Sequence, residues 1–561
     1  MYKLTLCLKY LLKRGLAYFA TAGVALCVFM MLVAVSVLNG FVAKIERAAK
    51  GLFGDVVVST ASLSGVGYYD EFIGRLKREV PQVAGASPFI LTYGILQIPG
   101  QPDFRRPVQV TGIRLPERAA VSDFEEGLFV QKGSAHPTWD PPTAEVLRRL
   151  AEEYRKVEAI RSRLGQAAGP AGMNDEQQNL WNRLDNALWF QARAIEDLRS
   201  AGARDMRIEL LNAEINAADQ RGDEKRRKEL TERLAEEQRR TIHAPADRVI
   251  LGLGIPGLSF RTPDGQTIRV IGPGQNVSLS IIPFGRALGS AEITPVTRTF
   301  TVIDDCSTDV SSIDSEVVYV PFETLQRLNN MAEERSAADP NVVVRPARCS
   351  QIHVKVAPQW SRGAKLLEVN RLIERCWIRF ERDYAARNLE VASTPVMVET
   401  WRQRQIKLVN QIESQRTLMV IILSVISFVA VLLIFVIFYV IVVQKTRDIG
   451  VLKAVGASGQ GVAAIFLAYG AAIGLVGSLL GVIGACEFVW NINPIHDWVA
   501  RTFGFEVWSR ETFMFEKIPN EVGLTTAVRV VLGAVLAGVT GALLPAVLAA
   551  RKQPVEALRY E

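Results

Sequence analysis

The chain has 561 residues, of which 49% are hydrophobic, and its formal net charge is +7. This length exceeds that of one compact domain, and the hydrophobic fraction is high for a soluble protein but low for one that lies mostly in a membrane. A basic excess can indicate nucleic-acid binding, but the sequence has no basic stripe interleaved with aromatic residues, which argues against nucleic acid as a partner. We therefore expect a few membrane spans joined to a large aqueous part.

Four apolar segments are long enough to cross a membrane, because a helix needs about 20 apolar residues to span a hydrocarbon core of roughly 30 Å. They are Leu16–Leu38, Leu418–Val443, Val462–Trp490 and Gly523–Ala550. Lysines and arginines gather at the N-terminus, between the second and third segments, and at the C-terminus. With four spans, all three groups fall on the cytoplasmic side. We expect a multi-pass protein of the inner (plasma) membrane, with a 1 + 3 arrangement of spans and both termini in the cytoplasm.

Between the first and second spans, the sequence predicts a large outward-facing α/β domain. Residues 41–141 and 247–416 contain strand-like runs and amphipathic helices, and they form its two parts. Residues 1–40 and 417–561 are assigned to the membrane part. The predicted fold is an α-helical membrane protein with four transmembrane helices and a large α/β periplasmic domain.

Residues 142–246 differ from their surroundings, because they are rich in Glu, Arg, Ala, Gln and Leu and contain no strand-like run. Leucines at helical spacing predict two or three helices that form a coiled-coil-like insertion, with breaks at Gly165–Gly172 and Ser200–Ala203. A solvated, partly mobile insertion is the alternative.

Glycines recur at intervals of three or four residues in the third span. Small residues on one face of a membrane helix allow close approach of a neighbouring helix, although glycine is also enriched in membrane helices generally. We favour close helix packing for this set: Gly470, Gly474, Gly477, Gly481 and Gly484.

A short polar stretch, residues 445–458, lies between the second and third spans and predicts a helix at the cytoplasmic membrane surface. A soluble partner could push on such a helix. Arg447 and Asp448 suit charge-assisted bonds to a partner protein, and Gly456 is placed to end the helix. The full expected contact set is Lys445, Arg447, Asp448, Val451, Leu452, Lys453, Val455 and Gly456.

The sequence argues against enzyme chemistry and bound cofactors. Residues 252–257 match G-x-G-x-x-G, but Pro256 and the strand-like sequence that follows do not suit a dinucleotide fold. The chain has no G-x-x-x-x-G-K-[ST] phosphate loop, and its histidines and cysteines lack the spacing of metal ligands. A disulfide between Cys306 and Cys349 is possible if the domain is extracytoplasmic.

Three stretches resemble the FtsX-like permeases of type VII ABC transporters. They are Asn39-Gly40-Phe41, residues 445–458, and the terminal residues 554–561. This family includes MacB-type efflux pumps and lipoprotein-releasing (LolC/LolE-like) permeases, and residues 83–122 and 251–356 match its MacB-like core domain more loosely. The run Thr400–Gln403 favours the lipoprotein-releasing branch. The resemblance implies a non-enzymatic subunit that partners a separate cytoplasmic ATPase and a second permease copy or homologue.

The resemblance also implies a function and two further sites. The expected function is extraction of lipoproteins towards a periplasmic carrier; the alternatives are MacB-like efflux with an adaptor, or mechanotransmission that activates an envelope hydrolase. The expected acyl-chain and lipid cavity comprises Met30, Met31, Leu38, Phe41, Leu418, Met419 and Ile422. The expected periplasmic partner loop comprises Asp304, Asp305, Asp309 and Asp314.

Overall fold

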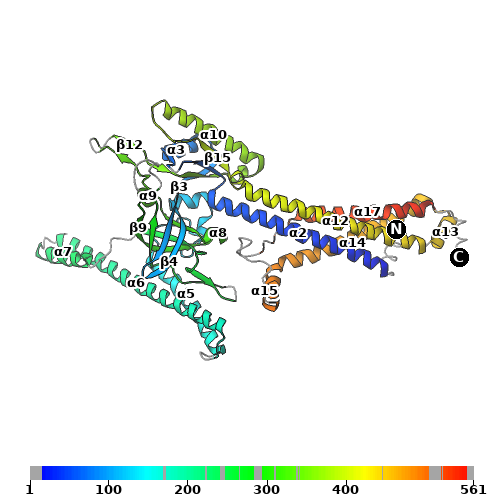
Figure 1. Ribbon diagram of the computed structural model, residues 1–561, viewed down its shortest axis with the longest axis horizontal. Coiled ribbons are helices and arrows are strands. Elements are labelled where there is room, and N and C mark those ends of the chain that lie inside the picture. Colours follow the sequence, from blue (N-terminus) through cyan, green and yellow to red (C-terminus); the bar gives the residue numbers. More distant parts are fainter. Residues whose placement is uncertain are drawn as a thin grey trace. The chain divides into compact units, whose positions relative to one another are not determined.

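The structure is a computed structural model that describes residues 15–551, with gaps (Figure 1). The gaps are residues 63, 169–171, 221–223, 240–246, 264–265, 284–293, 309–310, 337–338, 340–341, 445, 504–517, 519 and 521. The charged N-terminal residues and the C-terminal segment of the sequence analysis therefore lie outside the described residues. The described chain divides into two compact units, residues 15–46 with 405–551, and residues 47–404.

The first unit contains the four apolar helices that the sequence predicts, and each is long and apolar enough to cross a membrane. They are α2 (Gly15–Phe53), α12 (Ile406–Gln444), α14 (Gly459–Trp490) and α17 (Leu524–Arg551). The short helices α13 (Thr446–Ala454) and α15 (Ile492–Phe503) adjoin them. Both α2 and α12 are longer than the predicted spans, because polar helix-forming residues continue each helix beyond its apolar stretch.

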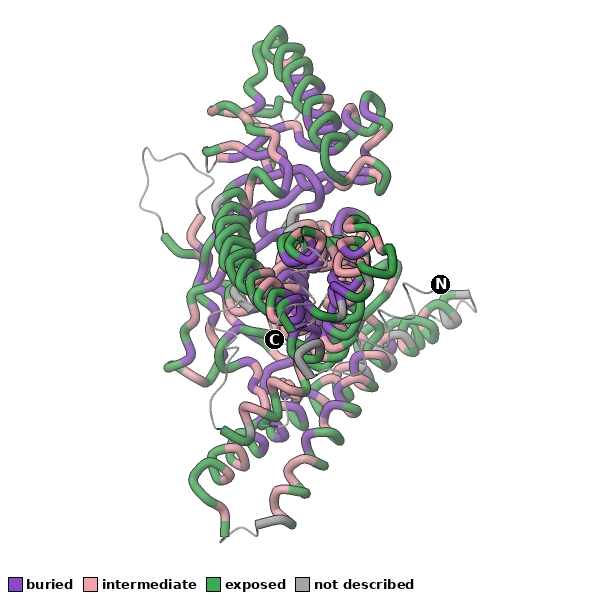
Figure 2. Tube along the Cα trace, turned by 90° about the vertical axis from the view of Figure 1, so that its right-hand side faces the viewer, coloured by how far each residue is buried: buried purple, intermediate pink, exposed green. Residues whose placement is uncertain are grey.

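The four long helices pack around a shared apolar core. Figure 2 shows them close to end-on, with buried residues on the sides that face one another. Phe438 of α12 meets Tyr469 of α14 edge to face, with the ring centroids 5.3 Å apart. The remaining buried members of this core are Ala20, Val24, Val28, Ile434, Ile437, Ile441, Ile473, Val530 and Ala542.

The second unit is built on a nine-stranded sheet with the order β15-β1-β14-β3-β4-β10-β5-β9-β8. Its strands are β1 (Val56–Thr60), β3 (Val83–Ile98), β4 (Gln101–Ile113), β5 (Asp247–Gly252), β8 (Asn276–Ile281), β9 (Val296–Cys306), β10 (Val317–Pro321), β14 (Gln351–Val356) and β15 (Val396–Thr400). The long strand β3 pairs with β14 along residues 83–89 and with β8 along residues 94–97. This change of partner closes the strands from β3 to β8 into a ring, while β14, β1 and β15 extend the sheet beyond it.

Shorter elements complete the sheet domain. Three two-stranded pairs are β2 (Val66–Gly67) with β13 (Arg348–Cys349), β6 (Ser259–Arg261) with β7 (Thr267–Arg269), and β11 (Glu334–Arg335) with β12 (Val343–Arg345). The short helices are α4 (Leu115–Val121), η1 (Phe124–Gly127), α8 (Ser311–Asp314), α9 (Phe322–Leu328), η2 (Pro358–Trp360) and α11 (Trp401–Arg404). As predicted, a strand (β6) and not a helix follows the glycine-rich residues 252–257.

Two amphipathic helices, α3 (Tyr69–Glu79) and α10 (Gly363–Ala385), pack together beside this sheet. The ring of Phe72 lies 4.9 Å from that of Trp377 and 5.3 Å from that of Phe380. In this sheet domain Cys349 and Cys306 are buried free thiols, so a disulfide between them is not formed. Burial raises the pKa of both thiols and keeps them protonated.

The insertion consists of three helices, α5 (Thr143–Ala168), α6 (Asp175–Gln220) and α7 (Glu224–Arg239). Helix α6 packs against both α5 and α7. The break expected at Ser200–Ala203 is wrong, because α6 continues through it to Gln220. A single glycine at position 202 costs a helix only about 1 kcal/mol, and the strong helix formers on either side outweigh that cost.

Candidate functional site

Helix α13 is held against the ends of three long helices by one apolar side chain. Ile449 is buried in a small core with Val442 of α12, Val462 of α14 and Ala549 of α17. On the same side, the Lys453 ammonium group donates a hydrogen bond to the carbonyl oxygen of Ala550 at the end of α17. A displacement of α13 must therefore disturb all three helices at once.

The opposite face of α13 is exposed. Arg447, Val451 and Val455 follow one another at a spacing of four residues, which places them on one face. Val451 is 49% exposed and Val455 is 85% exposed. The helix stops before Gly456, whose φ of 107° only glycine adopts easily. A small exposed surface with one cation and two apolar groups results.

The structure sorts the predicted contact set of α13 into two groups. Arg447, Val451 and Val455 are available to a partner, whereas Lys453 is directed to Ala550 of its own chain. Lys453 therefore acts as an internal tie that satisfies a helix C-terminal carbonyl. Lys445 lies outside the described residues, and so do the side chains of Asp448 and Leu452.

The glycine row of α14 contacts two different helices. A Cβ atom at Gly470 would lie 2.6 Å from the carbonyl oxygen of Gly538 in α17. A Cβ atom at Gly481 would lie 2.5 Å from the carbonyl oxygen of Ala25 in α2. Gly474 likewise approaches α17, and Gly477 approaches α2. The predicted close packing is confirmed for these four glycines, which join α14 to both neighbours through backbone contacts. A Cβ atom at Gly484 would make only an ordinary contact, 3.6 Å from Phe29.

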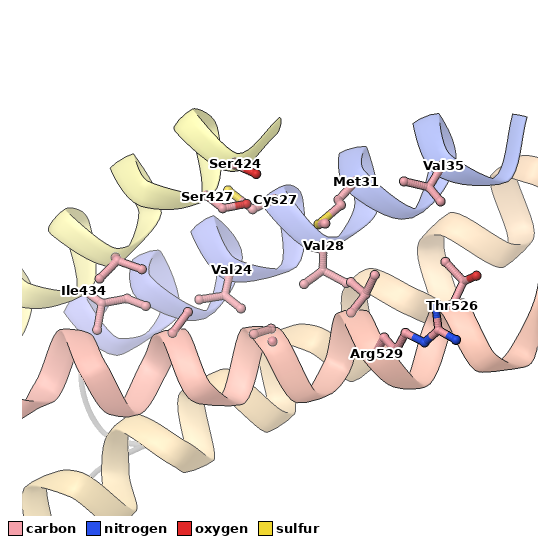
Figure 3. Close-up of a pocket in the computed structure, with 15 residues that line it drawn as sticks. Val24, Cys27, Val28, Met31, Val35, Ser424, Ser427, Ile434, Thr526 and Arg529 are labelled. Atoms are coloured by element: carbon pink, nitrogen blue, oxygen red, sulfur yellow. The ribbon is translucent and has the colours of Figure 1, made fainter. Parts of the chain in front are cut away.

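A cavity of about 410 Å³ lies between α2, α12 and α17 (Figure 3). Its walls are mostly apolar, and among the residues that line it only Arg529 of α17 is charged. The lining residues are Val24, Cys27, Val28, Met31, Val35, Ser424, Ser427, Val431, Ile434, Thr526, Arg529, Val530, Gly533, Ala534 and Ala537. The volume is within the range of roughly 300–1,000 Å³ that is usual for small-molecule sites.

Of the residues expected at the acyl-chain cavity, Met31 lines this one. Met30, Leu418, Met419 and Ile422 are exposed on the surface of the unit, and Leu38 and Phe41 are half-buried. The expected set is thus spread over the outside of α2 and α12 and is not gathered into one cavity of the chain. Sequence analysis missed Arg529, although an arginine within a span of low charge density is itself a functional signal.

The acidic residues expected to form a partner loop are internal. Asp304 is fully buried, and Asp305 and Asp314 are nearly so. The Asp304 carboxylate accepts hydrogen bonds from the backbone N–H groups of residues 129, 130, 131 and 305 at 2.8–3.1 Å. Burial and the neighbouring Asp305 raise the pKa of Asp304 to about 7. The oxygens of these three side chains bind their own chain, and Asp309 lies outside the described residues, so the partner loop stays a prediction.

Asp305 belongs to a buried ion network that attaches the helical insertion to the sheet. The Arg269 guanidinium of β7 donates to the Asp305 carboxylate at 2.6 and 3.0 Å, and its Nη1 lies 3.6 Å from the Glu153 carboxylate of α5. It also stacks over the ring of Phe129 at 3.8 Å. The Gln191 amide of α6 donates to the Arg269 carbonyl at 2.7 Å. Both α5 and α6 are thereby fixed to the sheet at their middle parts.

A second polar cluster, the Asp55 junction, joins the end of α2 to the residues that lead into α12. The Asp55 carboxylate accepts from the Val356 N–H at 2.9 Å and lies 3.6 Å from the Lys50 ammonium group. The Asp55 carbonyl accepts from the Trp401 N–H at 3.0 Å, and Lys50 lies over the Trp401 ring. Burial raises the pKa of Asp55, partly offset by the Val356 hydrogen bond and Lys50.

Comparison with known proteins places the membrane part in a family. Residues 420–554 match the model of the FtsX-like permease C-terminal domain. A LolC lipoprotein-releasing system transmembrane protein of Xylella fastidiosa (strain 9a5c) is 32% identical over 177 residues, 31% of this chain and 43% of the relative. LolC of Neisseria meningitidis serogroup B is 22% identical over 313 residues, 56% of this chain and 65% of the relative.

A LolE lipoprotein-releasing system transmembrane protein of Haemophilus influenzae is 24% identical over 186 residues, 32% of this chain and 45% of the relative. The matched segments thus span less than two thirds of each of these relatives. The family model covers α14 and α17 with most of α12, and it includes the exposed helix α13. The chain therefore contains a domain that matches the FtsX-like permease C-terminal family, and it is similar to the LolC and LolE transmembrane proteins.

Proposed function

We propose that this chain is the permease subunit of an ABC transporter that extracts lipoproteins from the inner membrane towards a periplasmic carrier. A separate cytoplasmic ATPase supplies the work, and the chain transmits the motion to its periplasmic domain. Four spans in a 1 + 3 arrangement, with cytoplasmic termini, place α13 on the ATPase side and residues 47–404 outside. The exposed face of α13 carries this proposal.

The reasoning starts from what α13 can transmit. Its outer face offers Arg447 for charge-assisted bonds and Val451 and Val455 for an apolar contact with a protein groove. Its inner face is fixed through Ile449 to α12, α14 and α17. Because close-packed interiors pass on displacements instead of absorbing them, a partner that moves α13 also moves the three spans.

A second permease fits the surface of α12. From Leu418 to Val429 most described side chains of this helix are exposed and apolar, whereas Leu423 is buried and Ser424 and Ser427 line the cavity. Lipid can cover such a helix, but a matching helix of a second permease would bury the same side chains and shape a cavity for acyl chains. Met30, Leu418, Met419 and Ile422 then line a cavity between two permeases, which accounts for their exposure in one chain.

The lipoprotein assignment rests on the relatives, whose names state lipoprotein release. It also fits a surface of flexible methionine and branched aliphatic side chains, which adapt to irregular acyl chains. MacB-like efflux and activation of an envelope hydrolase would use the same coupling helix, but the transmitted motion would drive a different process. The test must therefore separate coupling from cargo.

Coupling is tested by Val455→Asp in a complex reconstituted with the ATPase. An unpaired carboxylate in an apolar contact is costly, so we expect ATP-dependent lipoprotein release to fall at least about tenfold. Val455→Leu keeps an apolar contact and should retain release. Gln460→Asp, which adds the same charge at an exposed site at the start of α14, is the control. Full release by Val455→Asp would overturn the coupling role.

Cargo is tested by measuring which activity is lost with the coupling variant. Loss of transfer of a radiolabelled lipoprotein to a soluble carrier supports the proposed cargo. Unchanged transfer, together with increased drug sensitivity or a cell-wall defect, would overturn it in favour of efflux or hydrolase activation. Removal of residues 142–246 should leave lipoprotein transfer intact if the insertion serves another partner.

A further inference from the structure

The cavity between α2, α12 and α17 has a charged end and an apolar end. Figure 3 shows Arg529 and Thr526 at the end that Val35 marks, and Ile434 at the other end. The side chains between them are aliphatic apart from Cys27, Met31 and two serines. The Ser424 hydroxyl donates to the Val420 carbonyl of its own helix at 2.7 Å, so it adds little polarity to the cavity. The cavity is therefore amphipathic along its length.

The Arg529 side chain lines the cavity and is also exposed, so an anion from outside the chain can reach it. Its guanidinium keeps its charge in proteins, and the residues that the structure describes offer it neither an ion pair nor a hydrogen bond. Helix α17 begins at Leu524, so Arg529 lies about 8 Å along a span at 1.5 Å per residue. A cation at that depth extends towards the headgroup level of the membrane. Lipid phosphates are the anions available there.

We propose that this cavity binds one glycerophospholipid. The Arg529 guanidinium holds the phosphate by paired N–H···O bonds, for which its planar geometry is suited, and the Thr526 hydroxyl contacts the same headgroup. One acyl chain lies along the aliphatic wall towards Ile434. This site is formed within a single chain, and it differs from the proposed cavity between two permeases. An acylated cargo without a phosphate would leave Arg529 unpaired, so the occupant is a phospholipid and not the cargo.

A bound lipid here would act as a structural wedge. It separates α2 and α12 from α17, and α14 contacts both α2 and α17 through glycines. The position of these helices then depends on whether the cavity is filled. The proposal goes beyond transport of the cargo, because it concerns a resident lipid of the permease itself.

Gly533 provides a steric test of the acyl part. It lines the cavity, and a Cβ atom added there would meet no atom within 4 Å. Gly533→Leu should therefore fold and fill the cavity, while Gly533→Ala should leave most of it open. Arg529→Gln removes the charge and Arg529→Lys keeps it. Arg551→Gln, at the other end of α17, is the matched control for loss of one positive charge.

The experiment titrates the purified full chain in detergent with three probes, followed by native mass spectrometry. The probes are dioleoyl phosphatidylglycerol, dioleoylglycerol without a phosphate, and glycerol 3-phosphate without acyl chains. We expect one molecule of phosphatidylglycerol to bind and the other two to bind at least about tenfold more weakly. Arg529→Gln and Gly533→Leu should weaken binding of phosphatidylglycerol about tenfold. Arg529→Lys keeps the charge but not the paired bonds, so it should weaken binding less, and Gly533→Ala and Arg551→Gln should not weaken it.

Two results would overturn the proposal. Equal binding by all variants would mean that the lipid covers the outer surface and not the cavity. Equal binding of dioleoylglycerol would mean that Arg529 does not select a phosphate. A heat-unfolding measurement on each variant shows whether it is folded. If Arg529→Gln is not, the dioleoylglycerol probe on the unchanged chain still tests phosphate selection, and Gly533→Leu still tests the cavity. ATPase and carrier are absent from this assay, so its outcome is independent of lipoprotein release.

Discussion

The contact between Gly470 and Gly538 gives the sharpest stability prediction. A Cβ atom at Gly470 would lie 2.6 Å from the Gly538 carbonyl oxygen, and one at Gly538 would lie 2.5 Å from the Gly470 carbonyl oxygen. Close carbon–oxygen contacts are about 3.3–3.6 Å, so α14 and α17 must separate by about 0.7 Å to admit either methyl group. Because packing and not hydrophobic burial holds helices together in lipid, the separation weakens the whole contact.

Two effects of opposite sign determine the magnitude. Overpacking costs about 1–3 kcal/mol, whereas replacing glycine by alanine within a helix contributes about 1 kcal/mol of stability. We therefore expect Gly470→Ala and Gly538→Ala each to lower the free energy of unfolding by up to about 2 kcal/mol. Gly533→Ala is the matched control, because its Cβ meets no atom within 4 Å, and it should be neutral or stabilising.

The assay is reversible chemical unfolding of the full chain in mixed micelles, with the melting temperature as a second measure. The double variant Gly470→Ala/Gly538→Ala should lose less than the sum of the single losses, because one separation of the helices admits both methyl groups. If both single variants are as stable as Gly533→Ala, the close backbone contact does not stabilise the unit and the reasoning fails.

Three other substitutions test the sheet domain and α13. Arg118 is buried, donates to the Gly51 carbonyl of α2 at 3.1 Å and contacts the His353 ring at 2.8 Å. Arg118→Met should lower the free energy of unfolding by about 1–3 kcal/mol, because the carbonyl loses this donor. An unchanged midpoint of chemical unfolding would contradict this. The pKa of Asp304 is raised to about 7 from near 3.8, so the folded state keeps its proton longer than the unfolded state. Stability should therefore fall as the pH rises from about 4 to about 7, by at most about 1.4 kcal/mol per pH unit, and Asp304→Asn should flatten that slope. An equal slope in both proteins would exclude Asp304 as its source. Gly456→Ala strains a φ of 107° and should speed hydrogen exchange in residues 446–462 by about tenfold, given a cost of 1–2 kcal/mol; unchanged exchange would show that the turn does not need glycine.

Predictions that depend on local pattern match the structure well. The strands and amphipathic helices expected within residues 41–141 and 247–416 are present there, as β14 and α3 illustrate. Long apolar segments also predict the four long helices, since a span leaves few other conformations. The prediction of α2 ended too early and that of α12 began too late, because hydropathy marks the apolar part of a helix and not the helix itself.

The buried carboxylates show where local pattern fails. Asp304 and Asp305 occupy a run of acidic residues that usually lies at a surface. They are buried because β7 and α5, distant in the sequence, bring Arg269 and Glu153 to the same place, and because four backbone N–H groups converge on Asp304. Their positions depend on contacts between distant segments, which single-sequence patterns do not encode.

By itself, the sequence determined that this protein has four apolar helices, an α/β domain between the first two, and a polar helix between the second and third. Each of these follows from hydropathy, residue spacing or turn chemistry within about 30 neighbouring residues. Only the tertiary structure decided which side of α13 is exposed, which helices the glycines of α14 join, and that Arg529 lies in a cavity. Those properties arise where separate segments meet, and packing between them selects one arrangement among the many that the same local patterns permit.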